Sequence, residues 1–303
     1  MTEVKHSMTK KRIVSQAKLK IKDIIKKALA EDVGRGDITT KLIVSKDSFS
    51  EAQIVAKQAG ILAGSKIVQE VFKMLSPKIK IRFNLKEGEK FQSGDIIAEL
   101  EGPTRAILTG ERTALNFLCR LSGIATLTRR FVEKIAGTNA IILDTRKTTP
   151  NLRILEKYAV RIGGGQNHRF GLFDMILIKD NHIVAAGSLI NATKTAQLKN
   201  KARLPIEVEC KNISEVKQAL SLNVPWIMLD NMNLKQIKQA VRLCQGKSKL
   251  EVSGGVNLKN VQKIAETGVN YISVGAITHS APHIDISLEI KKCKTQKYSS
   301  SLR

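Results

Sequence analysis

DMILIKD, at residues 174–180, is the clearest of six short apolar runs that decide the fold of the second half of this chain. The runs follow one another at a spacing of roughly 20 to 35 residues and alternate with helical patterns, as the βα units of a parallel barrel do. The sequence therefore predicts a βα barrel with six recognisable strands and a seventh that is either unrecognised or absent. The other five runs are AIILD (140–144), PIEVEC (205–210), WIMLD (226–230), KLEVSGG (249–255) and YISVGA (271–276).

A polar residue or a glycine stands at or just beyond the end of each run. In βα barrels the C-terminal strand ends and the loops after them form the active face. We therefore expect these residues to converge on one cavity. They are Asp144, Lys179, Glu209, Asp230, Ser253 and Gly275.

The first βα units supply an unusual number of cationic side chains at these strand ends. Arginine matches a carboxylate with two parallel N–H donors, so the cluster suits a small substrate with several negative charges. A single histidine in a glycine-rich loop is more often structural, and an arginine on a helical connector, such as Arg112, is in isolation a surface residue. The cluster comprises Arg146, Lys147, His168, Arg169 and Lys179.

The later units supply carboxylates and glycine turns. Glu209 and Asp230 end apolar strands, where carboxylates accept hydrogen bonds from sugar hydroxyls or help to hold a divalent cation beside phosphates; the alternative is that they only pair with lysines. The turns at 253–255 and 274–276 occupy the last two units, where barrels often bind phosphate through backbone N–H groups. Each turn alone could be an ordinary βα turn, and the ordered pair favours phosphate binding. The turns are Ser253, Gly254 and Gly255, and Val274, Gly275 and Ala276.

The first half of the chain has a different pattern. Residues 21–30 have helical spacing, and residues 52–100 alternate like the strands of a small α+β unit with an antiparallel sheet. Residues 109–136 are amphipathic, and we expect two helices that meet near Ser122 and Gly123.

Composition narrows the class of protein. The net charge of +24 favours anionic partners, but the lysines are spread along the chain and no basic block alternates with aromatic residues, so we expect no specific nucleic-acid binding. No apolar run is long enough for a membrane helix. Four well-separated cysteines argue against zinc and disulfides and for a reducing cytoplasm. The basic N-terminus is interpreted as a flexible tail in preference to a mitochondrial transit peptide.

The chain resembles the quinolinate phosphoribosyltransferases, also called carboxylating nicotinate-nucleotide pyrophosphorylases, which are type II phosphoribosyltransferases. The resemblance runs in order from about Glu31 to Ile290. It rests on EDVGRGDITT (31–40), ERTALNFLCRLSGIATLT (111–128), DTRKTTP (144–150), GGGQNHR (163–169), LIKDNH (177–182), EVSGG (251–255) and YISVGAITHSAPHIDISLEI (271–290).

The resemblance implies an α/β chain in which an N-terminal α+β sandwich domain (21–125) is followed by an open, seven-stranded βα barrel (126–292). Basic tails would flank them at residues 1–20 and 293–303, and we leave open whether the segment near 283–292 packs back on the N-terminal domain. The implied enzyme is a cytoplasmic homodimer, with further assembly left open. It would use quinolinate, phosphoribosyl pyrophosphate and Mg²⁺ to give nicotinate mononucleotide, carbon dioxide and pyrophosphate in NAD biosynthesis.

The resemblance also implies roles for the site residues. Arg146, His168, Arg169 and Lys179 would hold the quinolinate carboxylates, with Thr145 beside them and Arg112 entering from the partner subunit. Lys147 would meet the phosphoribosyl group or its pyrophosphate. Glu209 and Asp230 would face the ribose and, directly or indirectly, the metal; these two and Lys147 are the predicted catalytic residues. The turns Ser253–Gly255 and Val274–Ala276 would hold the 5-phosphate.

Two departures and three alternatives accompany the resemblance. One departure is the basic N-terminal tail, which is longer than the core needs and to which the resemblance assigns no role. Asn151 stands where the family usually has glycine, and asparagine tolerates the left-handed backbone that this loop would need. The alternatives are a related phosphoribosyltransferase that uses nicotinate without decarboxylation, a Schiff-base aldolase with Lys179 as its lysine, and a nucleic-acid binder attracted by the net charge.

Overall fold

The computed structural model describes residues 19–295, so the two expected basic tails lie almost wholly outside the described residues. The chain forms two compact units. Among the described residues, the N-terminal unit contains 19–126, 150–162 and 282–295, and the barrel unit contains 127–149 and 163–281. The assignment of residues 150–162 to the N-terminal unit was not predicted, because their helical pattern also fits a βα crossover.

The N-terminal unit is built on a four-stranded antiparallel sheet in the order β12-β1-β5-β3. Side chains along β1 alternate between buried and more exposed positions, so one face of the sheet packs on the core. The antiparallel α+β unit predicted from residues 52–100 is thereby confirmed. The strands are β1 (Ser48–Ala56), β3 (Lys80–Phe83), β5 (Ile96–Pro103) and β12 (Ile286–Thr295), with a small pair formed by β2 (Gly60–Ile61) and β4 (Lys90–Phe91).

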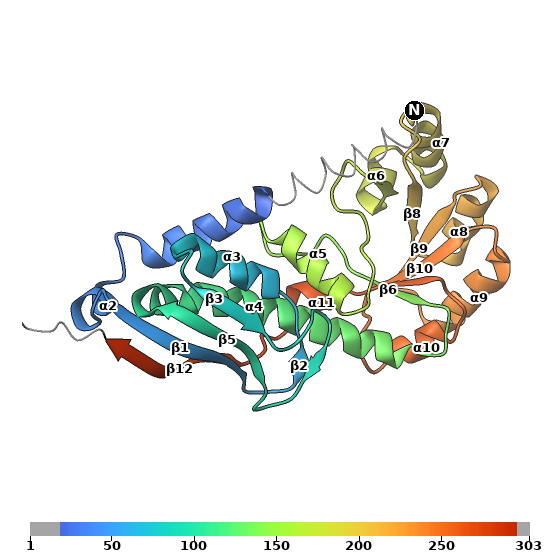
Figure 1. Ribbon diagram of the computed structural model, residues 1–303. Helices are drawn as coiled ribbons and strands as arrows, with labels where there is room; N and C mark the ends of the chain where they lie inside the picture. Colours follow the sequence, from blue (N-terminus) through green and yellow to red (C-terminus); the bar gives the residue numbers. More distant parts are fainter. Residues whose placement is uncertain (1–18, 296–303) are drawn as a thin grey trace, which may run out of the picture. The chain divides into compact units, whose positions relative to one another are not determined.

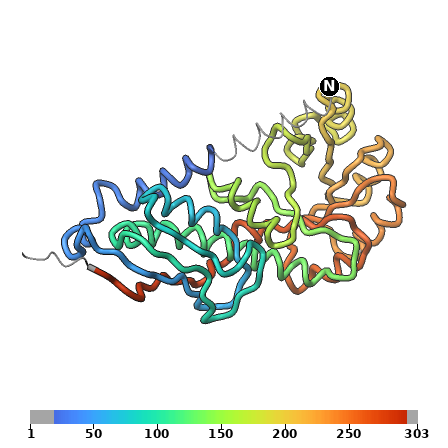
Figure 2. Tube along the Cα trace, in the orientation of Figure 1, coloured from blue at the N-terminus to red at the C-terminus, as the bar shows by residue number. Residues whose placement is uncertain are grey.

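The last strand of the described chain pairs with the first. β12 runs antiparallel to β1 from the pair Ser48 and Thr295 to the pair Ala56 and Ile286, with a register shift after Glu51. Figures 1 and 2 show this segment, at the red end of the colour scale, beside the blue β1 strand. The sheet therefore joins residues from both ends of the sequence.

The helices of the N-terminal unit surround its apolar core. Residues 19–33 are helical, which confirms the helix predicted over 21–30. Asp37 accepts a hydrogen bond from the Thr40 N–H and so caps the short helix that follows it. The named helices are α2 (Ile38–Ile43), α3 (Ser65–Leu75), α4 (Thr104–Lys134) and α5 (Arg153–Ile162), of which α4 continues into the barrel unit.

The expectation of two helices meeting at Ser122 and Gly123 is wrong, because α4 runs unbroken through both residues. The small size of Ser122 and Gly123 instead allows close packing. A Cβ at Gly123 would lie 2.0 Å from the carbonyl oxygen of Pro282, and the Ser122 hydroxyl lies 3.2 Å from the Ala63 amide nitrogen. Gly123 thus lets another backbone segment approach the helix where any side chain would collide.

The barrel unit contains six parallel strands in the order β6-β11-β10-β9-β8-β7, each at one of the six apolar runs. The expected seventh strand is reduced, among the described residues, to one isolated bridge between Leu143 and Gln166. Gln166 follows three glycines, which have little tendency to form a strand. The strands are β6 (Ile141–Leu143), β7 (Ile176–Ile178), β8 (Ile206–Cys210), β9 (Trp226–Asp230), β10 (Lys249–Ser253) and β11 (Tyr271–Ser273).

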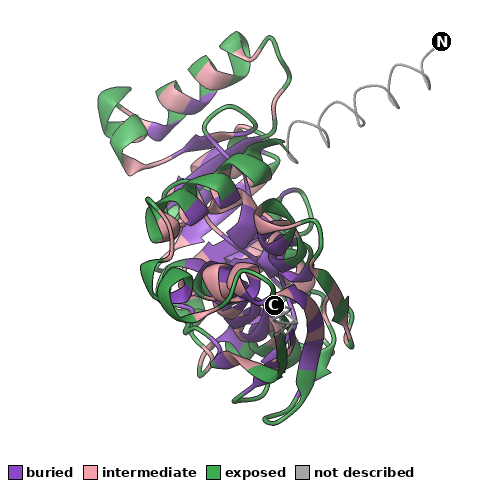
Figure 3. Cartoon of the chain, turned by 60° about the vertical axis from the view of Figure 1, so that its left-hand side comes forward, coloured by how far each residue is buried: buried purple, intermediate pink, exposed green. Residues whose placement is uncertain are grey.

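The sheet is an open βα barrel, because β6 and β7 are its two edges and do not pair with each other. All five residues of β8 are buried, as expected for a strand covered on both faces. Figure 3 shows buried residues along the strands and exposed ones on the outer helix surfaces. The helices between strands are α6 (Asp180–Ala185), α7 (Leu189–Lys199), α8 (Ile213–Ser221), α9 (Leu234–Cys244), α10 (Val261–Ala265) and α11 (Ala276–His279).

Two local expectations can be compared with the backbone. Asn151 has a φ of 65°, so the asparagine adopts the left-handed conformation expected for this loop. In the part of the chain that the structure describes, no helix is both long enough and apolar enough to cross a bilayer.

Candidate active site

One cavity of about 740 Å³ opens at the C-terminal ends of the barrel strands. It collects residues from the end of every strand and from the loop after Gln166, as the parallel arrangement predicts. Of the residues assigned to the site from sequence, all but Arg112 line it. They are Thr145, Arg146, Lys147, His168, Arg169, Lys179, Glu209, Asp230, Ser253, Gly254, Gly255, Val274, Gly275 and Ala276.

Arg169 lies with Arg146 on the cationic side of the cavity. Arg169 is buried and donates from Nη1 to the Met175 carbonyl at 3.2 Å. Burial, followed by the charge of Arg146, lowers the pKa of Arg169 below its ordinary value. Two guanidinium groups close enough to repel each other favour an anion that lies between or beside them.

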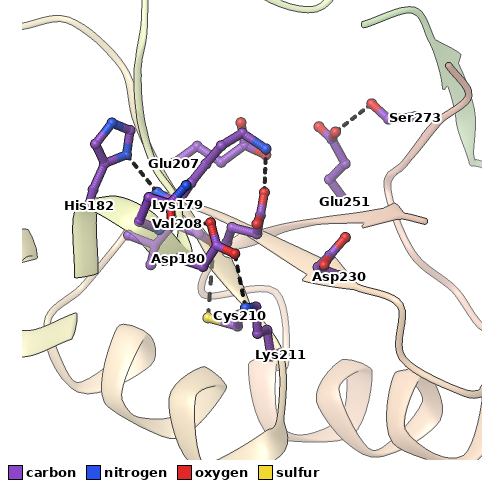
Figure 4. A network of polar contacts seen from close by, with 12 residues as sticks. Lys179, Asp180, His182, Glu207, Val208, Cys210, Lys211, Asp230, Glu251 and Ser273 are labelled. Atoms are coloured by element: carbon purple, nitrogen blue, oxygen red, sulfur yellow. Dashed lines mark hydrogen bonds and ion pairs between the residues drawn. The ribbon is translucent and has the colours of Figure 1, made fainter. Parts of the chain in front are cut away.

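Lys179 and Glu209 form an ion pair across neighbouring strands, with 2.5 Å between Lys179 Nζ and Glu209 Oε2. The Lys179 side chain is 42% exposed and that of Glu209 is 8% exposed. Asp230, labelled in Figure 4, lines the same cavity, and its carboxylate accepts from Asn231 Nδ2 at 3.0 Å. Opposite charges thus lie side by side in the cavity.

His168 has a buried carboxylate environment that the sequence did not reveal. The backbone N–H of His168 donates to Asp144 Oδ1 at 2.9 Å. His168 Nε2 lies 2.9 Å from Glu207 Oε2 and 3.4 Å from Glu251 Oε2, and both glutamates are fully buried. Figure 4 shows Glu251 directed toward Ser273, whose hydroxyl donates to Glu251 Oε1 at 2.5 Å.

The charges in this cluster change the proton affinities of its members. Burial alone lowers the pKa of His168, but the hydrogen bonds and charges of Glu207 and Glu251 outweigh it and raise the pKa to about 10. Burial and the charge of Glu251 raise the pKa of Glu207 above its ordinary range. The arrangement therefore favours a protonated imidazole beside carboxylates that are not both ionised.

Glu207 and Glu251 carried a weak signal in the sequence. Glu207 and Glu209 are two residues apart in IEVEC, so both side chains emerge on one face of β8. Met228 on β9 pairs with Glu209 of β8 on one side and with Glu251 of β10 on the other. Glu209, Met228 and Glu251 therefore lie at one level of the barrel. A glutamate within an apolar strand was the available clue, and its partner His168 comes from a distant loop.

The two glycine turns bring backbone close to the cavity. Gly254 has a φ of 90°, and a Cβ there would lie 2.2 Å from Asn231 Oδ1. A Cβ at Gly275 would lie 3.1 Å from His279 Nε2 and 3.3 Å from Lys147 Cδ. The Thr278 hydroxyl donates to the Lys147 carbonyl at 2.7 Å, so the second turn is tied to the loop that carries Lys147.

Arg112 does not join this cavity within one chain. It lies on α4, in the N-terminal unit, and is exposed. It is the one residue of the predicted site that the structure does not bring together with the others.

The fold and the cavity are those of a βα-barrel enzyme with cationic side chains at one group of strand ends and glycine turns at the last two. Residues 37–122 match the family described as quinolinate phosphoribosyl transferase, N-terminal domain. Residues 124–289 match the C-terminal domain of the same family.

Individual relatives extend over nearly the whole chain. A probable nicotinate-nucleotide pyrophosphorylase (carboxylating) of Bacillus subtilis (strain 168) is 44% identical over 272 residues, which cover 90% of this chain and 94% of the relative. A quinolinate phosphoribosyltransferase (decarboxylating) of Nicotiana tabacum is 42% identical over 289 residues, covering 89% and 82%. The crystal structure of a nicotinate-nucleotide pyrophosphorylase from Ehrlichia chaffeensis superimposes with a TM-score of 0.86 at 44% identity, covering 89% and 98%. This chain belongs to the quinolinate phosphoribosyltransferase family.

Proposed function

We propose that this protein transfers the phosphoribosyl group of phosphoribosyl pyrophosphate to quinolinate, with decarboxylation to nicotinate mononucleotide in NAD biosynthesis. The observation that carries the proposal is one cavity with buried cations at one group of strand ends and glycine turns at the last two. Family membership supports the same reaction.

The cationic side of the cavity would bind quinolinate through its two carboxylates. Arg146 and Arg169 supply planar donors that match a carboxylate, and His168 and Lys179 supply further positive groups, with Thr145 beside them. The glycine turns would hold the 5-phosphate with backbone N–H groups. With this proposed division, the pyridine ring and the ribose would lie next to each other, near Lys179 and Glu209.

The chemistry needs positioning more than proton transfer at its first step. The pyridine nitrogen forms a bond to C1 of the ribose as the bond to pyrophosphate breaks, and positive charge builds on the ribose. Lys147 would offset charge on the leaving pyrophosphate, and Glu209 and Asp230 would face the ribose. The cationic nitrogen of the adduct then stabilises the electron pair left on the ring carbon when carbon dioxide departs, and that carbon takes up a proton.

A magnesium ion fits the donors of this cavity. Glu209 and Asp230 offer carboxylate oxygens, the ligands that Mg²⁺ prefers, and two such residues suffice for an ion that keeps waters and takes substrate phosphates. We propose that these two residues hold it, directly or through water. The ion would supply charge neutralisation on the pyrophosphate.

We further propose a homodimer in which Arg112 enters the partner's cavity. Support comes from an arginine that is exposed on its own chain and from large apolar side chains exposed on α2, namely Ile38, Leu42 and Ile43. Mixing an Arg112→Ala chain with an Arg169→Ala chain tests this. Mixed dimers should regain activity at one intact site, whereas absence of any regain would exclude a shared site.

A reducing compartment, such as the cytoplasm, suits an enzyme whose four cysteines are all free. The aldolase alternative is weakened by the ion pair of Lys179 with Glu209, because a paired ammonium is a poor nucleophile.

The deciding experiment supplies quinolinate or nicotinate with phosphoribosyl pyrophosphate and measures carbon dioxide and pyrophosphate. Quinolinate should release both products, and only when phosphoribosyl pyrophosphate is present. Pyrophosphate release from nicotinate alone would favour the non-decarboxylating alternative. Arg169→Ala should raise the quinolinate KM by about tenfold or more, as expected for loss of a charge-assisted hydrogen bond.

A further inference from the structure

The cluster of His168, Glu207 and Glu251 is not needed to explain the barrel fold. Replacing such a buried group of charges by apolar residues is often neutral or stabilising. The presence of the cluster is therefore weak support for a purely structural role. The cluster also borders the cavity, because His168 and Glu251 both contribute to its lining.

The contacts specify where a proton must lie. Two carboxylate oxygens approach the same ring nitrogen, His168 Nε2, at 2.9 and 3.4 Å. An unprotonated nitrogen there would turn its lone pair toward the ionised carboxylate of the two, so Nε2 carries a hydrogen and donates it. The Ser273 hydroxyl holds Glu251 from the other side at 2.5 Å, so the acceptor is itself fixed.

The ring of His168 is also held at its face and at its backbone. Trp226 contacts it edge-on with ring centroids 6.0 Å apart, and Trp226 in turn stacks on Tyr271 at 4.6 Å. The backbone N–H of His168 is bound by the buried Asp144. One ring orientation is therefore determined by groups from β8, β9, β10 and the loop after β6.

We propose that Glu207 and Glu251 are positioning residues that keep the ring of His168 protonated and in one orientation, as a cationic donor for a carboxylate of the pyridine substrate. The inference rests on the proposed function, because it takes quinolinate as the occupant of the cationic side. The two carboxylates also reduce the net charge of the cationic cluster. The site can then hold a dianion and still release the carboxylate that becomes carbon dioxide.

The proposal predicts different effects on the KM values of the two substrates. Glu207→Gln and Glu251→Gln should each raise the quinolinate KM by about tenfold, the loss expected for one hydrogen bond to a charged group. The KM for phosphoribosyl pyrophosphate should stay within about twofold, because that substrate lies beyond these contacts. Glu209→Gln, two residues along the same strand, should instead raise the KM for phosphoribosyl pyrophosphate. Glu266→Gln, exposed at the C-cap of α10, should change neither.

A second measurement on the wild-type protein is independent of turnover. The chain has five histidines, so histidine-labelled protein gives few ring signals, and His168→Asn identifies the relevant one. The ring should stay protonated through neutral pH, in line with a pKa raised to about 10. In the double variant Glu207→Gln with Glu251→Gln, it should titrate nearer the ordinary histidine value.

The outcomes distinguish this inference from the proposed function. If wild-type protein does not convert quinolinate, the proposed function fails, although the titration still reports on the cluster. If conversion is normal, either of two results overturns the positioning role. One is an unchanged quinolinate KM in folded glutamine variants, and the other is a wild-type His168 that titrates at its ordinary pKa.

Discussion

Gly254→Ala tests the proposed phosphate turn through a defined chain of contacts. The alanine would have to keep a φ of 90°, where its Cβ would lie 2.2 Å from Asn231 Oδ1. A left-handed backbone costs an L-residue about 1–2 kcal/mol. The clash adds the displacement of Asn231, whose amide donates to Asp230 at 3.0 Å, and a hydrogen bond to a charged group is worth about 1.5–3 kcal/mol.

The two costs together are about 2.5–5 kcal/mol, part of which the turn can relieve by shifting. Because 1.4 kcal/mol is a factor of ten, we expect kcat/KM for phosphoribosyl pyrophosphate to fall by about 10- to 100-fold. The quinolinate KM should change little. The assay is steady-state pyrophosphate release with each substrate varied in turn.

Gly246→Ala is the matched control. Gly246 also has a positive φ, 79°, but a Cβ there would meet nothing within 4 Å, and the residue does not line the cavity. It should lower the thermal midpoint slightly and leave both KM values unchanged. If Gly254→Ala behaves like this control, the turn at 253–255 does not hold the phosphate.

Two further predictions concern the fold and the pH dependence of stability. Gly123→Ala should lower the thermal midpoint, because overpacking against Pro282 costs about 1–3 kcal/mol and exceeds the roughly 1 kcal/mol gained in helix propensity; Asn116→Ala, exposed on the same helix, should raise it slightly, and a rise for both would contradict the close approach. His168 has a folded pKa raised from 6.5 to about 10, so the stability that wild type gains over His168→Asn should be fully present below pH about 6.5 and decline as pH rises toward about 10. Chemical unfolding of both proteins across this range measures the difference, and a gain that instead grew with pH would exclude a charged His168.

The barrel and most of its cavity could be predicted because their signals are local. Each buried strand is a short apolar run, and a parallel sheet places all the C-terminal strand ends on one side. Residues such as Lys179 and Asp230 follow from that geometry alone. The predicted left-handed backbone at Asn151 was also a local property of the loop.

The parts that sequence reasoning missed depend on contacts between distant segments. Glu207 lies in a strand buried on both faces, where alternation does not separate core from cavity, and its partner His168 comes from another loop. Gly123 resembled a helix break because nothing local shows the approach of Pro282. The seventh strand was uncertain because a run of glycines can keep one ladder contact without forming a strand.

The pairing of β12 with β1 has a consequence for biosynthesis. The N-terminal sheet contains a strand, β12, that leaves the ribosome only after the barrel residues 163–281 have been made. An N-terminal domain usually folds before the rest of the chain is made, but this unit cannot complete its fold until β12 has been made. Until residues 286–295 are made, the edge of β1 that β12 covers remains open, and a nascent chain stalled before residue 286 carries an incomplete sheet.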